Sequence, residues 1–215
     1  MKRYLTILMT LPALPALAAC GATAVATASL PPAHHSPARC GARKGHTLAA
    51  NPAARVYVLH GVVYGCAGNG GHPYRLGFSR RCPLSTCVGR IVLAGPLVAY
   101  EEQDFGVDTV GAGIDVRDLR DGKLRVQDPA VSNVPGPESF AGVEAIVLRR
   151  DGAVAWIGEV SSVGHPNTVY EVHRVDSTGQ TLLDSGAKIN AKSLRLHGAT
   201  ITWSDGGHTH SATLA

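Results

Sequence analysis

A hairpin-sized segment recurs four times along the chain, and this recurrence constrains the fold more than any other feature. The four copies are VLHGVVYGC (58–66), VLAGPLVAY (92–100), VLRRDGAVAW (147–156) and RLHGATITW (195–203). Each copy carries a leucine, then a glycine turn, then a β-rich stretch, and the third copy is one residue longer than the others. A glycine can take the positive φ that a tight turn requires. Each copy therefore predicts a strand, a turn and a return strand.

The return strands alternate large and small side chains. The alternating triplets are Tyr64-Gly65-Cys66, Val98-Ala99-Tyr100, Val154-Ala155-Trp156 and Ile201-Thr202-Trp203. Residues two apart on a strand point to the same face, so the large side chains share one face and the small ones the other. We expect neighbouring sheets to cover both faces, with Tyr100, Trp156 and Trp203 in the core.

Further strands follow each hairpin, and no segment between them predicts a helix. The segments that contain these further strands are HPYRLG, GIDVRDLRDGKLRV, VYEVHRVDSTGQTLL and HTHSATL. The sequence therefore predicts an all-β domain over residues 40–215, an antiparallel repeat of three- to four-stranded units. The predicted units span about 55–78, 88–126, 143–186 and 189–214.

Units of this size match the blades of a β-propeller. The pattern L…DG.VAW…YEV…D..G, within residues 55–214, resembles the TolB-like and WD40-like repeats of extracytoplasmic bacterial proteins. The resemblance implies a small or open β-propeller, since four copies are fewer than those families usually carry. A β-sandwich of stacked hairpins is the alternative. An open arrangement would expose strand edges to a partner.

The N-terminus has the profile of an export signal. Lys2 and Arg3 precede an apolar run, Tyr4–Ala19, that two prolines interrupt, so residues 1–19 predict a signal peptide. The sequence Leu17-Ala18-Ala19-Cys20 resembles a bacterial lipobox, which implies lipidation of Cys20 and a cell-membrane lipoprotein. Cleavage after Ala26-Thr27-Ala28 would instead release a secreted protein.

Residues 20–39 are rich in Ala, Thr, Pro and Ser and show no periodicity, which predicts a disordered tether. His34 and His35 lie within it, and a solvated spacer explains them better than a metal site. No later segment is apolar and long enough to span a bilayer, so the membrane contact we expect is the lipid anchor alone.

The number of cysteines agrees with the prediction of an exported, lipidated protein. Of the five cysteines, Cys20 would carry the lipid, and Cys40, Cys66, Cys82 and Cys87 would form two disulfides in an oxidising compartment. Three pairings are possible from sequence. We favour Cys40 with Cys66 and Cys82 with Cys87, because the second pair closes a tight loop. A lone C-x4-C without a matching second pair does not predict a zinc site.

Enzymatic motifs are absent from the sequence: there is no nucleophile elbow, H-E-x-x-H, phosphate-binding loop or dinucleotide fingerprint, and no cofactor is predicted. Glu101, Glu102 and Asp104 could serve a secreted hydrolase, although a polar loop would also gather such residues. Asp115, Asp118 and Asp121 are three apart, a spacing that does not fit the alternate acids of a calcium loop.

His208 and His210 are weak metal-site candidates. They lie two apart on a predicted strand and share a face, where a third ligand such as His173 or His165 could join them. An exposed edge strand explains the pair better, so no metal is predicted.

The charge of the chain excludes a large class of partners. The formal net charge is +4, the signs are interspersed, and no basic face gathers, so nucleic acid is not an expected partner. We expect an exported, lipid-anchored binding or interaction module of the cell envelope, whose ligand is a protein or a glycan. The alternatives are a secreted hydrolase and a purely structural envelope protein.

Overall fold

The computed structural model describes residue 40, residues 45–68, 71–79, 82, 86–134 and 136, and residues 138–215. Within these residues the protein is all-β and contains no helix, as the sequence predicts. None of the described segments is a helix that could cross a membrane. The predicted signal peptide, Cys20, and the tether with His34 and His35 lie outside the described residues.

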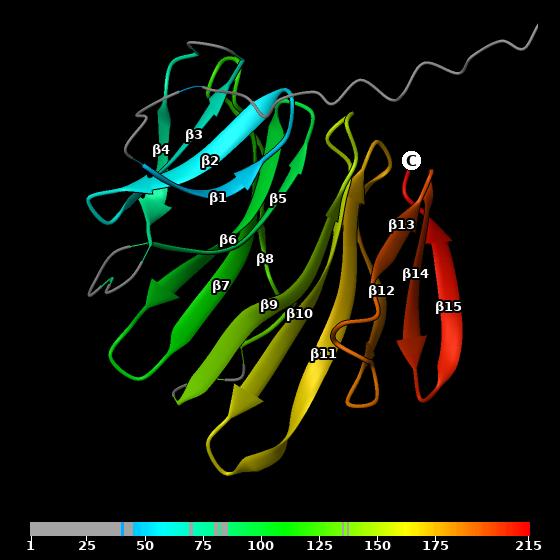
Figure 1. Cartoon of the computed structure of the whole chain (residues 1–215). Helices are drawn as coiled ribbons and strands as arrows, with labels where there is room; N and C mark the ends of the chain where they lie inside the picture. The colour runs from blue at the N-terminus through cyan, green and yellow to red at the C-terminus, as the bar shows by residue number, and fades with distance from the viewer. Residues whose placement is uncertain are drawn as a thin grey trace, which may run out of the picture. The chain divides into compact units, whose positions relative to one another are not determined.

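Fifteen strands follow one another along the described part of the chain (Figure 1). They are β1 (His46–Ala50), β2 (Ala54–Leu59), β3 (Val62–Ala67), β4 (Tyr74–Phe78), β5 (Cys87–Ala94), β6 (Leu97–Phe105), β7 (Val110–Asp118), β8 (Leu124–Pro129), β9 (Ser139–Leu148), β10 (Val154–Ser162), β11 (His165–Asp176), β12 (Gly179–Gly186), β13 (Arg195–His197), β14 (Thr200–Asp205) and β15 (His208–Thr213).

The strands pair as four successive antiparallel meanders. Meander 1 contains β1–β4, meander 2 contains β5–β8, meander 3 contains β9–β12 and meander 4 contains β13–β15. Among the described residues, only single parallel bridges connect the first three meanders into one twelve-stranded sheet, Phe78 with Cys87 and Val110 with Phe140. Meander 4 is a separate sheet, and the described strands do not close into a ring.

The recurring segments form the hairpins β2–β3, β5–β6, β9–β10 and β13–β14, so the hairpin prediction is confirmed. Their turn glycines, Gly61, Gly95, Gly152 and Gly198, all have positive φ, between 60° and 103°. A side chain at such a position would strain the backbone, which explains why glycine recurs there.

Three buried clusters lie between successive meanders. One joins residues of meanders 1 and 2, including Val56 and Val98. A second joins meanders 2 and 3, including Ile114 and Val154, and a third joins meanders 3 and 4, including Val172. Meanders 2 and 3 are therefore covered on both faces by their neighbours.

Each large return-strand residue belongs to the cluster shared with the preceding meander. Tyr100 lies between meanders 1 and 2, Trp156 between 2 and 3, and Trp203 between 3 and 4. The small residues Ala99 and Ala155 belong to the cluster shared with the following meander. The period-two alternation in sequence thus sets the order in which the sheets stack.

Trp156 is the largest fully buried side chain of this stack. Its Nε1 donates a hydrogen bond of 2.9 Å to the carbonyl of Ala130, and its ring stacks on His173 with the centroids 5.1 Å apart. The buried His173 in turn contacts Glu171, whose Oε2 also accepts from the backbone N–H of Ser132. Although burial acts to raise the pKa of Glu171, these hydrogen bonds hold it below its usual value.

Two disulfides join Cys40 to Cys66 and Cys82 to Cys87, the pairing that the sequence favours. They indicate an oxidising, extracytoplasmic environment. Cys40 and Cys66 form a small buried cluster with Tyr57 on the return-strand face of meander 1. In the other meanders the equivalent face packs on the preceding meander, so here the disulfide covers it instead.

Replacing Cys40 and Cys66 together with serine should lower the free energy of unfolding by about 3.5 kcal/mol, the chain-entropy value for a loop of this length. Urea unfolding of the oxidised protein measures the loss. The same unfolding experiment on the Cys82→Ser, Cys87→Ser variant is the matched control. Its short loop should contribute about 2 kcal/mol, and an equal loss in both variants would contradict this ranking.

Candidate functional site

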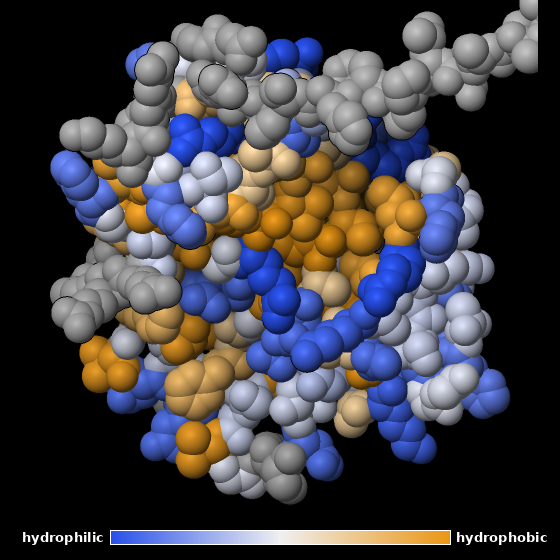
Figure 2. Space-filling model, in the orientation of Figure 1, coloured by the Kyte–Doolittle hydropathy of each residue, from blue (hydrophilic) through white to orange (hydrophobic). Residues whose placement is uncertain are grey.

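An apolar groove of about 480 Å³ opens between the first strands of meanders 2 and 3 and the loop before β13. Figure 2 shows apolar surface gathered in a hollow on this side of the molecule, with hydrophilic side chains beside it. Apolar and charged residues of β5, β9, the loop and the start of β13 line the groove. The apolar residues are Ile91, Val92, Ala145, Ile146 and Leu194, and the charged ones are Arg90, Glu144, Lys192 and Arg195.

The edges of β5 and β9 meet beside this groove through Glu101. Its Oε2 accepts from the backbone N–H of Arg90 at 3.2 Å, and its Oε1 accepts from the backbone N–H of Val143 at 3.0 Å. Arg90 completes the contact by donating to the carbonyl of Val143 and to Oε2 of Glu144. Glu101 is only 4% exposed.

Glu101 is therefore a structural carboxylate that satisfies the backbone of two facing strand edges. The position of the Glu101 carboxylate leaves no room for a side chain at residue 89, because a Cβ there would lie 2.0 Å from Oε2 of Glu101. Of the other acids in the proposed hydrolase set, Asp104 is exposed and Glu102 is half-buried in a different pocket. The structure does not bring the three acids together.

A second, polar pocket of about 400 Å³ lies where β4 of meander 1 approaches β6–β8 of meander 2. Glu102, Asp115, Arg75 and Arg117 line it together with Tyr100. The Tyr100 hydroxyl donates a 2.8 Å hydrogen bond to Oδ2 of Asp115. Burial raises the pKa of Tyr100, so this hydroxyl stays a donor.

Asp115 is a carboxyl group whose protonation changes in the physiological range. Burial raises the pKa of Asp115 to about 6, and the nearby carboxylate of Glu102 raises it further. The hydrogen bond from Tyr100 and the charge of Arg117 act in the opposite direction and limit the rise. Two carboxyl groups in one pocket, one of them with a raised pKa, is an arrangement that general acid–base chemistry uses.

The remaining aspartates of the DVRDLRDG segment serve the β7–β8 turn. Arg120 and Arg125 contact Oδ2 of the buried Asp118 at 2.6 Å and 3.0 Å, and Arg125 reaches Asp121 as well. Hydrogen bonds from Arg120 hold the pKa of Asp118 far below its usual range. Asp118 and Asp121 are thus turn residues paired with arginines.

The pH dependence of stability should report on Asp115. Its pKa in the folded protein, about 6, lies above the value of 3.8 for an aspartate in an unfolded chain. The folded state therefore binds the proton more tightly, and stability falls as pH rises between these values, by about 2 to 3 kcal/mol in total. In the Asp115→Asn variant, which keeps an oxygen for Tyr100, this fall should vanish. Urea unfolding from pH 3.5 to 7.5 measures it, and parallel curves for variant and wild type would contradict the assignment.

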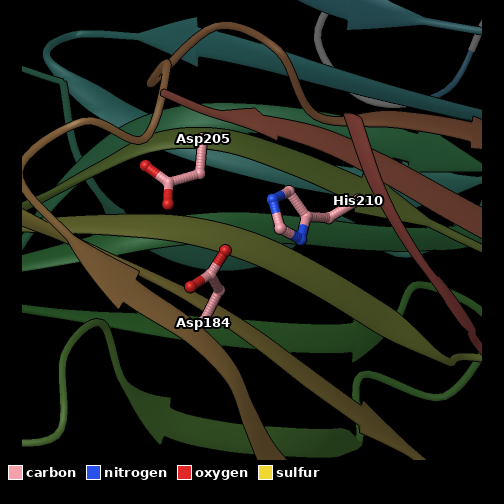
Figure 3. A group of neighbouring side chains, drawn as sticks. All are labelled: Asp184, Asp205 and His210. Carbon is pink, nitrogen blue, oxygen red and sulfur yellow. The ribbon is translucent and has the colours of Figure 1, made fainter. Parts of the chain in front are cut away.

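The histidines singled out by the sequence divide between two places. His173 is buried beside Trp156, where its Nε2 contacts Glu171, and it belongs to no group of three possible ligands among the described residues, while His165 begins β11. His208 and His210 share a face of β15, opposite Asp205 and Trp203 in the strand register. Only His210 joins a cluster of possible metal ligands, with Asp184 and Asp205 (Figure 3).

Sequence reasoning missed both aspartates of this cluster, as well as the pairing of Glu102 with Asp115. Asp184 lies on β12 and Asp205 ends β14, so no motif spacing connects them. The one usable signal was the strand alternation, which places Trp203 and Asp205 on the same face.

The fold and the disulfides define an extracytoplasmic, all-β protein built from four stacked antiparallel meanders. No family model matches the chain, and no curated protein and no solved structure is significantly similar to it. Its function must therefore be argued from its own surfaces.

Proposed function

We propose that the protein is an exported, lipid-anchored binding module of the cell envelope, and that the apolar groove is its binding surface. The four meanders would act as blades of a small, open β-propeller, with the first strand of each blade innermost. The extracytoplasmic disulfides support export, and the lipobox-like sequence ending at Cys20 supports the anchor.

The observation that carries this proposal is the pair of strand edges at the groove. Consecutive residues of β5 (90–92) and of β9 (144–146) all line it, so the strands present their edges to the groove rather than one face alone. Apart from one bridge each, β5 pairs only with β6 and β9 only with β10 among the described strands. Edges of this kind supply hydrogen bonds to a ligand's backbone.

The ligand that fits these features is an extended polypeptide segment of an envelope protein. Its backbone would pair with the edge of β5 or β9 beyond the groups that Glu101 and Arg90 already bind, and its alternate apolar side chains would contact Ile91, Ala145 and Leu194. Acidic residues at its ends would meet Lys192 and Arg195, which also line the groove. A glycan would instead need several polar groups to converge in the groove, whereas five of its nine lining residues are apolar.

A library of random displayed peptides tests the proposal directly. Selection on the wild type should enrich extended sequences with alternating apolar residues and flanking acids. Ala145→Asp, within the groove, should weaken the selected peptides at least tenfold by placing a charge among the apolar side chains that the peptide would contact. Lys192→Glu, at an exposed position of the groove, should weaken the acidic peptides without disturbing the core.

The matched control is Leu182→Asp, because Leu182 is an exposed apolar residue on β12 that does not line the groove. It should leave peptide binding unchanged. Equal loss in Ala145→Asp and Leu182→Asp, or binding that Ala145→Asp and Lys192→Glu both leave intact, would contradict the groove as the binding surface.

A second candidate function, hydrolysis, is favoured by one observation, the carboxyl pair Glu102 and Asp115 in the polar pocket. Asp115 would act as the acid and Glu102 as the second carboxyl group, as in glycoside hydrolases. Turnover of any member of a chromogenic glycoside panel, lost in both Asp115→Asn and Glu102→Gln, would support this function. Turnover that survives in both variants would contradict it.

A further inference from the structure

Asp184, Asp205 and His210 gather at the junction between meanders 3 and 4 (Figure 3). Asp184 comes from β12, Asp205 from the end of β14, and His210 from β15. One ligand atom of each side chain lies within 4.8 Å of the corresponding atoms of the other two.

The β14–β15 hairpin places two of these side chains on one face. Its turn residues, Gly206 and Gly207, have φ values of 56° and 86°, which fit the tight turn that leaves Asp205 paired with His208. Two residues further along, Trp203 pairs with His210. Opposite residues of an antiparallel pair share a face, so Asp205 and His210 lie on the same face as Trp203.

Trp203 lies next to the cluster and orients two of its members, Asp184 and His210. Its indole N–H donates a 2.6 Å hydrogen bond to Oδ2 of Asp184, and its ring stacks on the His210 imidazole with the centroids 5.7 Å apart. The backbone N–H of Ser185 donates to the other oxygen of Asp184. Because Trp203 itself is only 5% exposed, it is a rigid support for both ligands.

The cluster has no cation of its own. Throughout the described part of the chain, neither Asp184 nor Asp205 forms an ion pair with a lysine, arginine or histidine. Two carboxylates within this distance repel each other, whereas a divalent cation between them would be attracted by both.

We propose that Asp184, Asp205 and His210 bind a divalent transition-metal ion of the zinc class. Two carboxylate oxygens and one imidazole nitrogen suit such ions better than Mg²⁺ or Ca²⁺, which prefer oxygen ligands alone. Bonds of about 2.0–2.2 Å bring ligand atoms no more than about 4.4 Å apart. Since His210 is exposed, a small rotation of its side chain closes the remaining gap. Water would fill the open coordination positions.

The ion would add a link between two sheets that share no ladder of strand pairing and are joined by side-chain packing and a few hydrogen bonds, such as that from the N–H of Ser177 to the carbonyl of Ala215. Asp184 belongs to meander 3, while Asp205 and His210 belong to the three-stranded meander 4, which forms a separate sheet. Zinc should therefore stabilise the C-terminal sheet against local opening.

Thermal unfolding with and without ZnCl₂ tests the site in a full chain that carries no affinity tag. His34 and His35 are replaced by alanine in every sample, so that the adjacent histidines near the N-terminus do not contribute. At a hundredfold excess of zinc over its dissociation constant, Tm should rise by about 5 °C or more. MgCl₂ at the same concentration should leave Tm unchanged. Amide exchange in β13–β15 should slow with zinc.

Variants distinguish the site formed by Asp184, Asp205 and His210 from a site formed by His208 and His210 alone. Asp205→Asn and His210→Ala should each abolish the rise in Tm with zinc, and His208→Ala, on the same strand face but outside the cluster, should retain it. The absence of a rise in the parent protein would overturn the proposal. So would an undiminished rise in Asp205→Asn, or an equal loss in His208→Ala and His210→Ala.

Discussion

Trp156→Ala should lower the free energy of unfolding by about 3 to 5 kcal/mol, the range for removing a large buried aromatic side chain. The side chain is fully buried among residues of meanders 2 and 3, so neither meander alone can fill the space that it leaves. Its hydrogen bond to the carbonyl of Ala130 and its stacking on His173 would also be lost. Urea unfolding at pH 7 measures the change.

Trp156→Phe separates packing from hydrogen bonding. Phenylalanine keeps an aromatic ring in the cluster but leaves the carbonyl of Ala130 without its donor, so the loss should be smaller than for alanine. A Trp156→Ala variant as stable as the wild type would place this side chain on a surface and contradict the stacked arrangement.

Glu101→Ala should be almost as damaging, at about 3 to 5 kcal/mol, although the residue is an acid. Removal of its carboxylate leaves the backbone N–H groups of Arg90 and Val143 without acceptors. Val143 is buried, so water cannot easily replace the lost hydrogen bond at that edge. Thermal and urea unfolding both measure the effect.

Asp104→Ala is the matched control for this prediction. Asp104 lies on the same strand, β6, but is exposed, so its replacement should change stability by no more than about 0.5 kcal/mol. If the two variants were equally stable, Glu101 would not connect the edges of β5 and β9.

Strand alternation was sufficient to predict the hairpins and the core position of the tryptophans. In Val154-Ala155-Trp156 the period of two already assigns each side chain to one face, and the structure buries both faces. The sequence does not say which sheet covers which face. That order depends on contacts between meanders, such as the hydrogen bond from Trp156 to Ala130.

The site residues were harder to predict, because they too come together only through contacts between strands that are distant in sequence. Glu101 looked like a loop acid because its partners, Arg90 and Val143, come together only when β5 and β9 approach each other. His210 was identified from its spacing with His208, but its neighbours Asp184 and Asp205 come from other strands. Local patterns predict strands and faces, whereas sites between sheets depend on tertiary packing.

The central claim is that the recurring hairpins stack in chain order, with each large return-strand side chain packed on the preceding meander. Nuclear Overhauser effects from the two tryptophan rings in a methyl-labelled sample test it most directly. The Trp156 ring should show contacts to methyl groups of meander 2, such as those of Ile114, and the Trp203 ring to those of meander 3, such as those of Val172. Contacts from each ring only to methyl groups of its own hairpin would contradict the stacked fold.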